Sequence, residues 1–293
     1  MVFATRHQQV QQILQICNEH RIPLTPRGTG TGTTGATVPD HGGIILSLER
    51  MARILDIDPR NRIARVEPGV TNGDLQQALA EYGFFWPPDP TSAAVCTLGG
   101  NLAYNAAGPR AVKYGTPREN TLGLRAVTGA GEEIRTGVIT SKGVVGYDLT
   151  RLIIGSEGTL GFIAEITYRT VEEHEHKASA LAVFPDVKTA CRAVEVLKGQ
   201  PVAAAELMDR AALRSVQGKP GIPEYFAALP ETAAALLVET RSMPEASETG
   251  RRAISRMASD SHSRLRTNQY PCVAAANNSM AMVADSGVAS PVP

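Results

Sequence analysis

Apolar residues near the start of the chain recur with the period of an α-helix. Val10, Ile13, Leu14 and Cys17 stand at positions i, i+3, i+4 and i+7, which places all four on one face of a helix. The spacing predicts an amphipathic helix over residues 6–19 that packs this face against a core.

Shorter apolar runs then predict β-strands joined by glycine-rich turns. The run at 22–24 precedes the loop PRGTGTGTTG at 26–35, and the run IILSL follows at 44–48. A strand, a glycine-rich turn and a second strand are expected in this order. Alternating apolar and polar positions predict another strand within residues 60–70, which ends at Pro68-Gly69.

The middle of the chain is predicted to be mostly β. Asn72-Gly73-Asp74 can cap a short helix that ends at Gly83, whereas residues 84–118 are too rich in proline, glycine and asparagine for long regular elements. Residues 123–136 alternate around a Gly-Ala-Gly turn, as in a β-hairpin. Residues 151–169 place a glycine-rich turn between two β-type runs.

Helical spacing returns in the last third of the chain. It predicts helices over residues 186–198 and 205–216, and the run AAALLVET predicts a strand over residues 233–240. The chain is therefore predicted to be an α+β protein, in which a second α+β region begins near residue 172.

The end of the chain, Arg251–Pro293, differs in composition from the rest. It contains five arginines, seven serines and eight alanines but no lysine, glutamate, phenylalanine or tryptophan, and no amphipathic period continues through it. An irregular tail is expected there. We interpret it as a divergent end or an out-of-frame translation, a hypothesis that sequencing of the source DNA tests.

Composition narrows the function classes. Lysine and arginine total 29 against 29 aspartates and glutamates, so the chain lacks the basic excess of proteins that bind the nucleic-acid backbone. No apolar run reaches the ~18 residues that cross a bilayer, and the N-terminus lacks the apolar stretch of a signal peptide. Four widely spaced cysteines predict free thiols and a cytoplasmic location. The 27 glycines and 19 prolines indicate several loops that bind through their backbone.

The first glycine-rich loop contains GTGTTG at 30–35, which matches the G-x-G-x-x-G pattern of dinucleotide-binding folds. A Rossmann site needs a helix to begin inside the motif, and the following ATVPDHGG at 36–43 cannot form one. A P-loop is excluded because no Gly-Lys-Ser/Thr closes the run. The remaining interpretation is a nest of backbone N–H groups for a nucleotide diphosphate, beside the positive charge of Arg27, with a plain surface loop as the alternative.

Two further glycine-rich segments carry candidate binding groups. CTLGGNLAYNAAGP at 96–109 combines Gly99-Gly100, which allow a ligand to approach the backbone, with the amides of Asn101 and Asn105. GSEGTLG at 155–161 is the third segment. Either segment by itself is typical of an ordinary turn, but three such segments in one chain favour a ligand.

These segments, in this order and spacing, resemble the FAD-binding domain of the vanillyl-alcohol-oxidase type flavoproteins, the PCMH-type domain. The matching runs are PRGTGTGTTG, VEPGV, PPDPTSAAVCTLGGNLAYNAAGPRAVKYGTPRENTLGL and GYDLTRLIIGSEGTLGFIAE. Within the family, the chain resembles the glycolate oxidase flavin subunit and the FAD-dependent D-lactate dehydrogenases. The resemblance implies two α+β subdomains that hold FAD over residues 1–171, with an incomplete N-terminal edge. It also implies a partial α+β cap domain over 172–250, followed by the tail at 251–293.

The resemblance also implies which residues bind FAD. The FAD pyrophosphate is expected to be cradled by Arg27, Gly28, Thr29, Gly30, Thr31, Gly32 and Gly35. The isoalloxazine is expected to lie near Pro88, Asp89, Pro90 and Ser92, and the pyrophosphate and ribityl chain are expected to be lined by Thr97, Gly99, Gly100, Asn101, Asn105 and Gly108. The adenosine is expected to be bordered by Glu157, Gly158 and Ile163. The first loop lacks the histidine that tethers the flavin in some relatives, so non-covalent FAD is expected.

The chemistry that the resemblance implies is hydride transfer from C2 of a 2-hydroxy acid, of the glycolate or D-lactate type, to flavin N5. Electrons would then pass to a partner such as an iron–sulfur or second flavin subunit, which would hold the protein at the inner membrane. In relatives the base and the carboxylate-binding cation come largely from the cap, including a motif that resembles HxxGDGNxH. This sequence lacks that motif, so no catalytic base is assigned.

The missing motif leaves an alternative function open. The chain is then a non-catalytic FAD-binding subunit, or a truncated, inactive product that needs a partner chain to complete the substrate site. No metal site is expected, because His174 and His176 in VEEHEHK are interpreted as part of a solvated segment.

Overall fold

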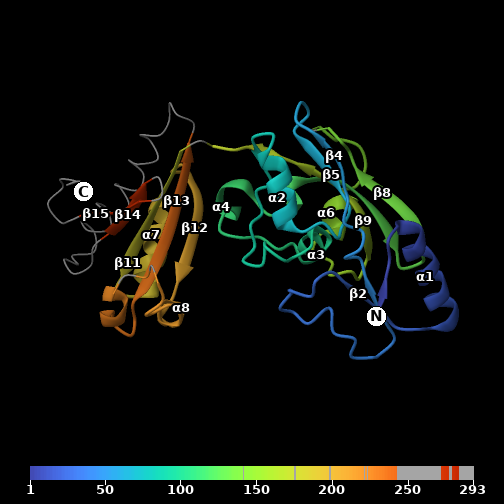
Figure 1. Cartoon of the computed structure of the whole chain (residues 1–293), viewed down its shortest axis with the longest axis horizontal. Helices are drawn as coiled ribbons and strands as arrows, with labels where there is room; N and C mark the ends of the chain where they lie inside the picture. The colour runs from blue at the N-terminus through green and yellow to red at the C-terminus, as the bar shows by residue number, and fades with distance from the viewer. Residues whose placement is uncertain are drawn as a thin grey trace. The chain divides into compact units, whose positions relative to one another are not determined.

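The computed structural model describes residues 1–140, 142–174, 176–197, 199–220, 222, 224–242, 272–276 and 279–283. The chain divides into two compact units, Met1–Glu173 and His174–Pro293, each with its own sheet and core. In Figure 1 the colour of the first unit runs from blue through green, and that of the second from yellow to red.

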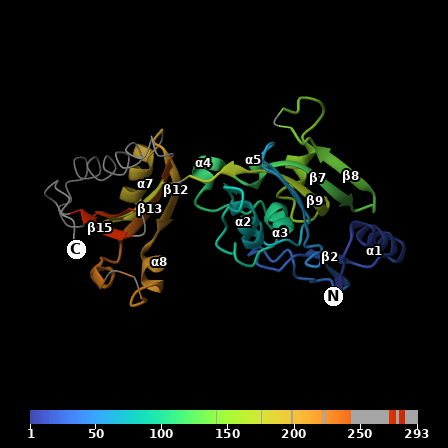
Figure 2. The same ribbon diagram turned by 45° about the horizontal axis from the view of Figure 1, so that its top comes forward.

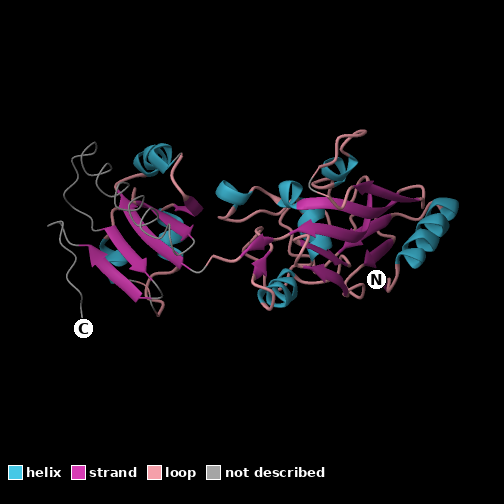
Figure 3. Ribbon diagram, turned by 90° about the horizontal axis from the view of Figure 1, so that it is seen from above, coloured by secondary structure: helices cyan, strands magenta, loops and turns pink. Residues whose placement is uncertain are grey.

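The largest sheet of the first unit has five antiparallel strands in the order β4-β5-β9-β7-β8. Figure 3 shows these strands side by side in magenta. The hairpin formed by β7 and β8 confirms the one predicted over residues 123–136, with Val127 opposite Glu133 beside the turn. The strands are β4 (Ile54–Asp58), β5 (Ile63–Val66), β7 (Thr121–Thr128), β8 (Glu133–Gly137) and β9 (Gly161–Arg169).

Two smaller sheets complete the strands of this unit. β1 (Val2–Phe3), β3 (Ile44–Ser47) and β2 (Leu24–Arg27) form a parallel sheet in that order. β6 (Phe84–Phe85) pairs antiparallel with β10 (Val171–Glu172). The connection from β2 to β3 contains no helix, so the predicted order of strand, glycine-rich turn and strand is confirmed.

Six helices accompany these sheets among the described residues of the first unit. They are α1 (His7–His20), α2 (Asn72–Ala80), α3 (Leu98–Tyr104), α4 (Ala111–Tyr114), α5 (Pro117–Asn120) and α6 (Leu149–Ile153). The amphipathic first helix is confirmed, since Val10, Leu14 and Cys17 are its buried residues. The second helix is confirmed too, but its N-cap is Thr71, whose hydroxyl accepts the backbone N–H of Asp74.

The prediction of a strand just before the third glycine-rich turn is wrong, because residues 149–153 form α6. Asp148 caps this helix by accepting the backbone N–H of Arg151 at 2.9 Å. The Arg151 side chain also pairs with the same carboxylate at 2.5 Å. This local capping outweighs the β-propensity of the short run RLII, whose apolar residues fit one helical turn equally well.

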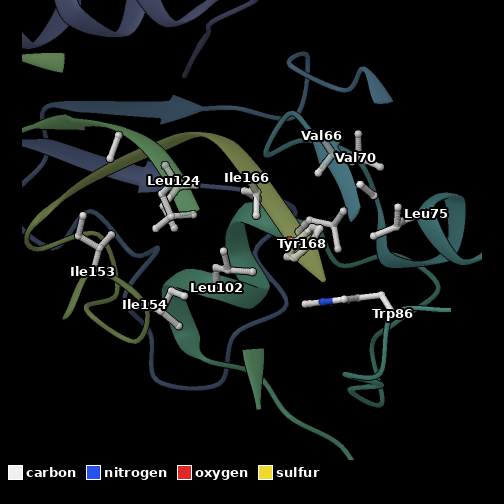
Figure 4. Packing of buried hydrophobic residues seen from close by; sticks show 14 of the residues in the cluster. Val66, Val70, Leu75, Trp86, Leu102, Leu124, Ile153, Ile154, Ile166 and Tyr168 are labelled. Carbon is white, nitrogen blue, oxygen red and sulfur yellow. The ribbon is translucent and has the colours of Figure 1, made fainter. Parts of the chain in front are cut away.

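The core of the first unit lies between the large sheet and the helices α2 and α3. Figure 4 shows Ile166 and Tyr168 of β9, Leu102 of α3 and Leu75 of α2 pointing into one cluster. Trp86, the single tryptophan of the chain, is fully buried there, with its ring centroid 4.4 Å from that of Tyr168. The packing holds α2 and α3 against the sheet.

The buried Tyr168 hydroxyl predicts a specific pH dependence of stability. Burial raises the pKa of Tyr168 well above its ordinary value, so the folded protein keeps this proton at alkaline pH where the unfolded chain releases it. The free energy of unfolding is therefore unaffected by the ionisation of this hydroxyl below about pH 10. Above that pH it falls, by up to about 1.4 kcal/mol per pH unit, because only the unfolded chain releases the proton. Tyr168→Phe is expected to lose less stability on alkalinisation, as measured by urea unfolding at pH 8 and at pH values above the tyrosine pKa.

The matched control for this prediction is Tyr147→Phe, because the Tyr147 side chain is 95% exposed. It is expected to leave the alkaline loss unchanged. If Tyr168→Phe and the wild-type chain lose the same stability across this range, the Tyr168 hydroxyl does not govern the alkaline response.

The described part of the second unit forms an antiparallel sheet in the order β12-β13-β11-β14-β15. Its elements are β11 (His176–Phe184), α7 (Val187–Leu197), β12 (Val202–Met208), α8 (Arg210–Ser215), the 3-10 helix η1 (Glu224–Ala228), β13 (Ala234–Ser242), β14 (Cys272–Ala276) and β15 (Ser279–Val283). Phe184 of β11 packs with the α7 cluster, whereas its neighbour Val183 packs with the α8 cluster. Since successive strand residues point to opposite faces, α7 and α8 cover opposite faces of the sheet (Figure 2).

The helix at 186–198 and the strand at 233–240 are confirmed as α7 and β13. The helix predicted over 205–216 is wrong in its first part, because residues up to Met208 form β12 and the helix begins at Arg210. Pairing with β13 overrides the helical propensity of the alanine-rich run, and Asp209 caps α8 by accepting the N–H of Ala212 at 2.8 Å.

The irregular tail predicted over 251–293 falls largely outside the described residues. Two described segments within it, β14 and β15, are strands of the second sheet, and β14 pairs with β11. For these two segments the expectation of irregular structure is wrong. Short alanine-rich runs carry little periodicity, so pairing with an existing strand decides their conformation.

Candidate functional site

The first glycine-rich loop, from Arg27 to Gly35, follows the carboxyl end of β2. Gly30 and Gly35 have φ angles of +76° and +83°, a conformation that favours glycine, and both residues are exposed. A Cβ on Gly30 would lie 2.8 Å from Nη2 of Arg27, so the guanidinium lies against the loop backbone. The loop therefore presents backbone groups to solvent beside a fixed positive charge.

Helix α3 brings a second predicted segment against this loop. Thr97 is the N-cap of α3, and a Cβ on Gly28 would overlap the Thr97 hydroxyl. At the other end of the helix, the Tyr104 hydroxyl lies 3.0 Å from that of Thr33. Both ends of α3 therefore contact the first loop.

Gly99 is required for the close approach of α3 to the chain before α2. Its N–H donates to the carbonyl of Pro68 at 2.8 Å, and a Cβ there would lie 2.5 Å from Cβ of Pro68. Asn105 ends α3 in the left-handed conformation with φ of 56°. These two residues set the position of the helix and of its end.

The third glycine-rich segment forms a turn that contacts both of the others. In this turn the backbone N–H of Gly155 donates to the carbonyl of Leu102 at 2.9 Å, and that of Glu157 donates to the carbonyl of Ala103 at 2.8 Å; both carbonyls belong to α3. The hydroxyl of Thr34, in the first loop, donates to Oε2 of Glu157 at 2.9 Å. Three segments separated by more than 40 residues in sequence thus converge at one place.

The segment from Pro88 to Ser92 is anchored separately. Asn72 of α2 donates its Nδ2 to the carbonyl of Pro88 at 3.1 Å. The carboxylate of Asp89 forms an ion pair with Nε of Arg110 at 3.2 Å. A Cβ on Gly108 would overlap the backbone carbonyl oxygen of Asp89. This arrangement joins the segment predicted to approach the isoalloxazine to Gly108, the last residue predicted to line the pyrophosphate and ribityl chain.

The predicted cofactor residues therefore differ in their surroundings. Most of them lie in the loops and turns just described, whereas the side chain of Ile163 is 4% exposed and belongs to the core of the first unit. The residues in the loops, turns and α3 are Arg27, Gly28, Thr29, Gly30, Thr31, Gly32, Gly35, Pro88, Asp89, Pro90, Ser92, Thr97, Gly99, Gly100, Asn101, Asn105, Gly108, Glu157 and Gly158.

Asn101 provides an independent indication of a polar ligand. It lies on α3 with 2% of its surface exposed, and its Nδ2 has no hydrogen-bond partner within the described part of the chain. A buried donor without a partner costs about 1–3 kcal/mol. An unsatisfied buried amide on α3, the helix that the first and third glycine-rich segments contact, fits a polar ligand such as FAD.

The structure also brings in residues that the sequence analysis did not select. Thr33, Thr34 and Tyr104 connect the first loop to α3 and to the third segment. Arg118 of α5 donates from Nε and Nη2 to the carbonyl of Ile154 at 3.1 and 3.0 Å. The threonines belong to the glycine-rich motif itself, but no local signal in the sequence marks Tyr104 or Arg118.

Two expected absences concern the residues that the structure describes. No group of three or more histidine, cysteine, aspartate or glutamate side chains could hold a metal ion there. None of the helices within the described ranges has the length and apolar content needed to cross a bilayer. Cys17, Cys96 and Cys191 are free thiols.

Two family models match the chain. The model described as "FAD binding domain" matches residues 1–137, and the model described as "FAD linked oxidases, C-terminal domain" matches residues 173–281. The second match extends into the region predicted to be a divergent tail. The first match lies within the first compact unit and the second lies almost entirely within the second, while residues 138–172 lie outside both.

Named relatives agree with these models. The glycolate oxidase subunit GlcD of Bacillus subtilis is 41% identical over 219 residues, which is 73% of this chain and 47% of the relative. The mitochondrial D-lactate dehydrogenase (cytochrome) of Arabidopsis thaliana is 38% identical over 218 residues, 74% of this chain and 38% of the relative. GlcD of Escherichia coli is 36% identical over 219 residues, covering 74% and 44%. The chain spans less than half the length of each.

Solved structures show the same fold. A structure of alkyldihydroxyacetonephosphate synthase superposes with a TM-score of 0.72 at 21% identity, over 89% of this chain and 51% of the other. The α+β fold with a PCMH-type FAD-binding domain and an oxidase C-terminal domain is thereby confirmed. The chain belongs to the FAD-linked oxidases, related to glycolate oxidase subunits and D-lactate dehydrogenases, and its cofactor is FAD.

Proposed function

We propose that the chain is the flavin-binding part of an FAD-dependent oxidoreductase that oxidises a small 2-hydroxy acid of the glycolate or D-lactate type. The observation that carries this proposal is the similarity to a glycolate oxidase subunit at 41% identity and to a D-lactate dehydrogenase at 38%. The glycine-rich segments that converge in the first unit support it. The proposal places the FAD-binding domain at residues 1–171 and the start of the cap at 172–250.

The first loop is proposed to hold the FAD pyrophosphate. Its exposed backbone N–H groups form the donor set, and Arg27 supplies the opposite charge. Asn101 is proposed to donate its buried Nδ2 to the same cofactor, which would satisfy a group that has no partner in the described part of the chain. Glu157 and Gly158 are proposed to border the adenosine, while the contact predicted for Ile163 stays a prediction.

When bound, FAD supplies the acceptor for the hydride from C2 of the substrate. The residues of this chain contribute by holding the cofactor in position. Asp89 is fixed by Arg110 and Gly108, so the Pro88–Ser92 segment keeps one conformation beside the proposed isoalloxazine site. A segment held at this place would orient the ring, which favours hydride transfer.

A partner subunit is part of the proposal. The relatives from Bacillus subtilis and Escherichia coli are named as subunits, which supports assembly of this chain with an iron–sulfur or second flavin subunit. That partner would take the electrons and would hold the protein at the inner membrane. The free thiols of Cys17, Cys96 and Cys191 support a reducing compartment such as the cytoplasm.

The visible spectrum of the purified chain, reconstituted with FAD, tests the proposal. Oxidised-flavin bands that bleach on anaerobic addition of glycolate or D-lactate are the expected result. Bands that do not bleach would support the alternative of a non-catalytic FAD-binding subunit, and the assay is then repeated with a partner present. A chain that cannot be reconstituted with FAD contradicts both.

Two further measurements use the same sample. Trp86 is the single tryptophan and lies in the core of the first unit, so bound flavin is expected to quench its emission by energy transfer. FAD is expected to leave the polypeptide on acid precipitation, because the first loop contains no histidine to tether it. Flavin that stays on the denatured chain would refute non-covalent binding.

A further inference from the structure

Arg118 holds the third glycine-rich turn from a position outside every predicted set. Its guanidinium donates two hydrogen bonds, from Nε at 3.1 Å and Nη2 at 3.0 Å, to the carbonyl oxygen of Ile154. Ile154 is completely buried and directly precedes the turn. The two charge-assisted bonds therefore fix the point at which the chain enters the turn.

The backbone of Arg118 extends this connection to α3. Its N–H donates to Oδ1 of Asn105, which ends α3, at 3.3 Å. The helix that carries Arg118 is itself held by a capping box, in which Thr116 and Glu119 satisfy each other's backbone groups. Arg118 is thus a fixed element and joins α3 to the turn.

The turn has little freedom to compensate for a loss of Arg118. Gly155 has φ of +84°, and a Cβ there would lie 2.6 Å from Nη2 of Arg118, so backbone and guanidinium are in direct contact. Glu157, a non-glycine residue, also has a positive φ of 52°. A non-glycine residue in this region is under strain and keeps it only when its surroundings impose it.

The far side of the turn faces the first loop. Thr34 donates to the carboxylate of Glu157, and a Cβ on Gly158 would overlap the ring of Pro26. The conformation that Arg118 imposes is therefore transmitted to the place where the first and third segments meet. This is where the proposed function puts the adenosine half of the cofactor.

We propose that Arg118 is a positioning residue that makes the site prefer FAD over FMN. The inference rests on the proposed FAD site. In the proposed site, FAD would reach the turn with its adenosine half, whereas FMN lacks that half and would not contact the turn. Loss of Arg118 should therefore weaken FAD binding and leave FMN binding nearly unchanged.

The experiment compares the dissociation constants of FAD and FMN for the full chain and its variants, measured by Trp86 emission and by calorimetry. In Arg118→Met, FAD affinity is expected to fall about tenfold or more while FMN affinity changes less than about twofold. Arg118→Lys, which cannot place two N–H donors on one carbonyl, is expected to fall between the wild type and Arg118→Met. FMN binding shows at the same time that each variant is folded.

Arg151→Met is the matched control, because Arg151 is 53% exposed and lies on the neighbouring α6. It should leave both affinities unchanged. An unchanged ratio of FAD to FMN affinity in Arg118→Met, whether both affinities fall or neither does, overturns the inference while the proposed FAD site stands. A wild-type chain that binds no FAD overturns the proposed function and this inference with it.

Discussion

A Gly108→Ala variant is expected to bind FAD about 10- to 100-fold more weakly than the wild-type chain. The added methyl group would overlap the backbone carbonyl oxygen of Asp89 and lie against its carboxylate, so the Pro88–Ser92 segment would have to move. Forcing extra atoms into a packed site costs about 1–3 kcal/mol, and each 1.4 kcal/mol lost from binding is a factor of ten. Calorimetric titration of the FAD-free protein measures the effect.

The matched control is Gly129→Ala in the turn of the β7–β8 hairpin. No atom lies within 4 Å of a Cβ built on Gly129, and its φ is not in the left-handed region. FAD affinity should be the same as in the wild type. If Gly108→Ala also binds FAD normally, the contact between Gly108 and Asp89 does not shape the site.

A Leu102→Ala variant is expected to lose about 2–5 kcal/mol of the free energy of unfolding. Leu102 is completely buried in the core of the first unit and belongs to α3, which carries predicted FAD-binding residues (Figure 4). Such a loss is a large fraction of the about 5–15 kcal/mol that stabilises a typical domain. Urea unfolding of the FAD-free protein measures it, and saturating FAD should restore part of the loss, because FAD binds only the folded state.

Leu152→Ala is the control with the same chemical change on another helix. Leu152 lies on α6 and is 59% exposed, so its truncation should alter the free energy of unfolding by about 0.5 kcal/mol or less. Equal losses in the two variants would contradict the packing of α3 against the large sheet.

Strong local patterns allowed several elements to be predicted from the sequence. The apolar stripe of α1, the spacing of α7 and the glycine turn of the β7–β8 hairpin each act over a few residues, and each is confirmed. Prediction was wrong where two conformations compete locally. Residues 149–153 and 202–208 carry apolar runs that fit a helix or a strand. Capping by Asp148 makes the first a helix, and pairing with β13 makes the second a strand.

The candidate site shows the same division. The glycine-rich motifs identified the family and the cofactor, because backbone-binding loops need glycine at particular positions and those positions are visible in the sequence. The placement of Arg118 and Tyr104 was not predictable, since neither has a distinctive local pattern. Their importance depends on a carbonyl and a hydroxyl that other segments bring to them.

The sequence by itself determined the α+β class, the family and the cofactor, and it predicted the loops that bind FAD. Only the tertiary structure decided that Gly28 meets Thr97, that Thr34 meets Glu157 across 123 residues, and that the buried Nδ2 of Asn101 has no partner among the described residues. The physical reason is the distance along the chain over which each property acts. Periodicity, capping and glycine conformations are local properties, whereas contacts between distant segments exist only when the core of the whole unit has packed.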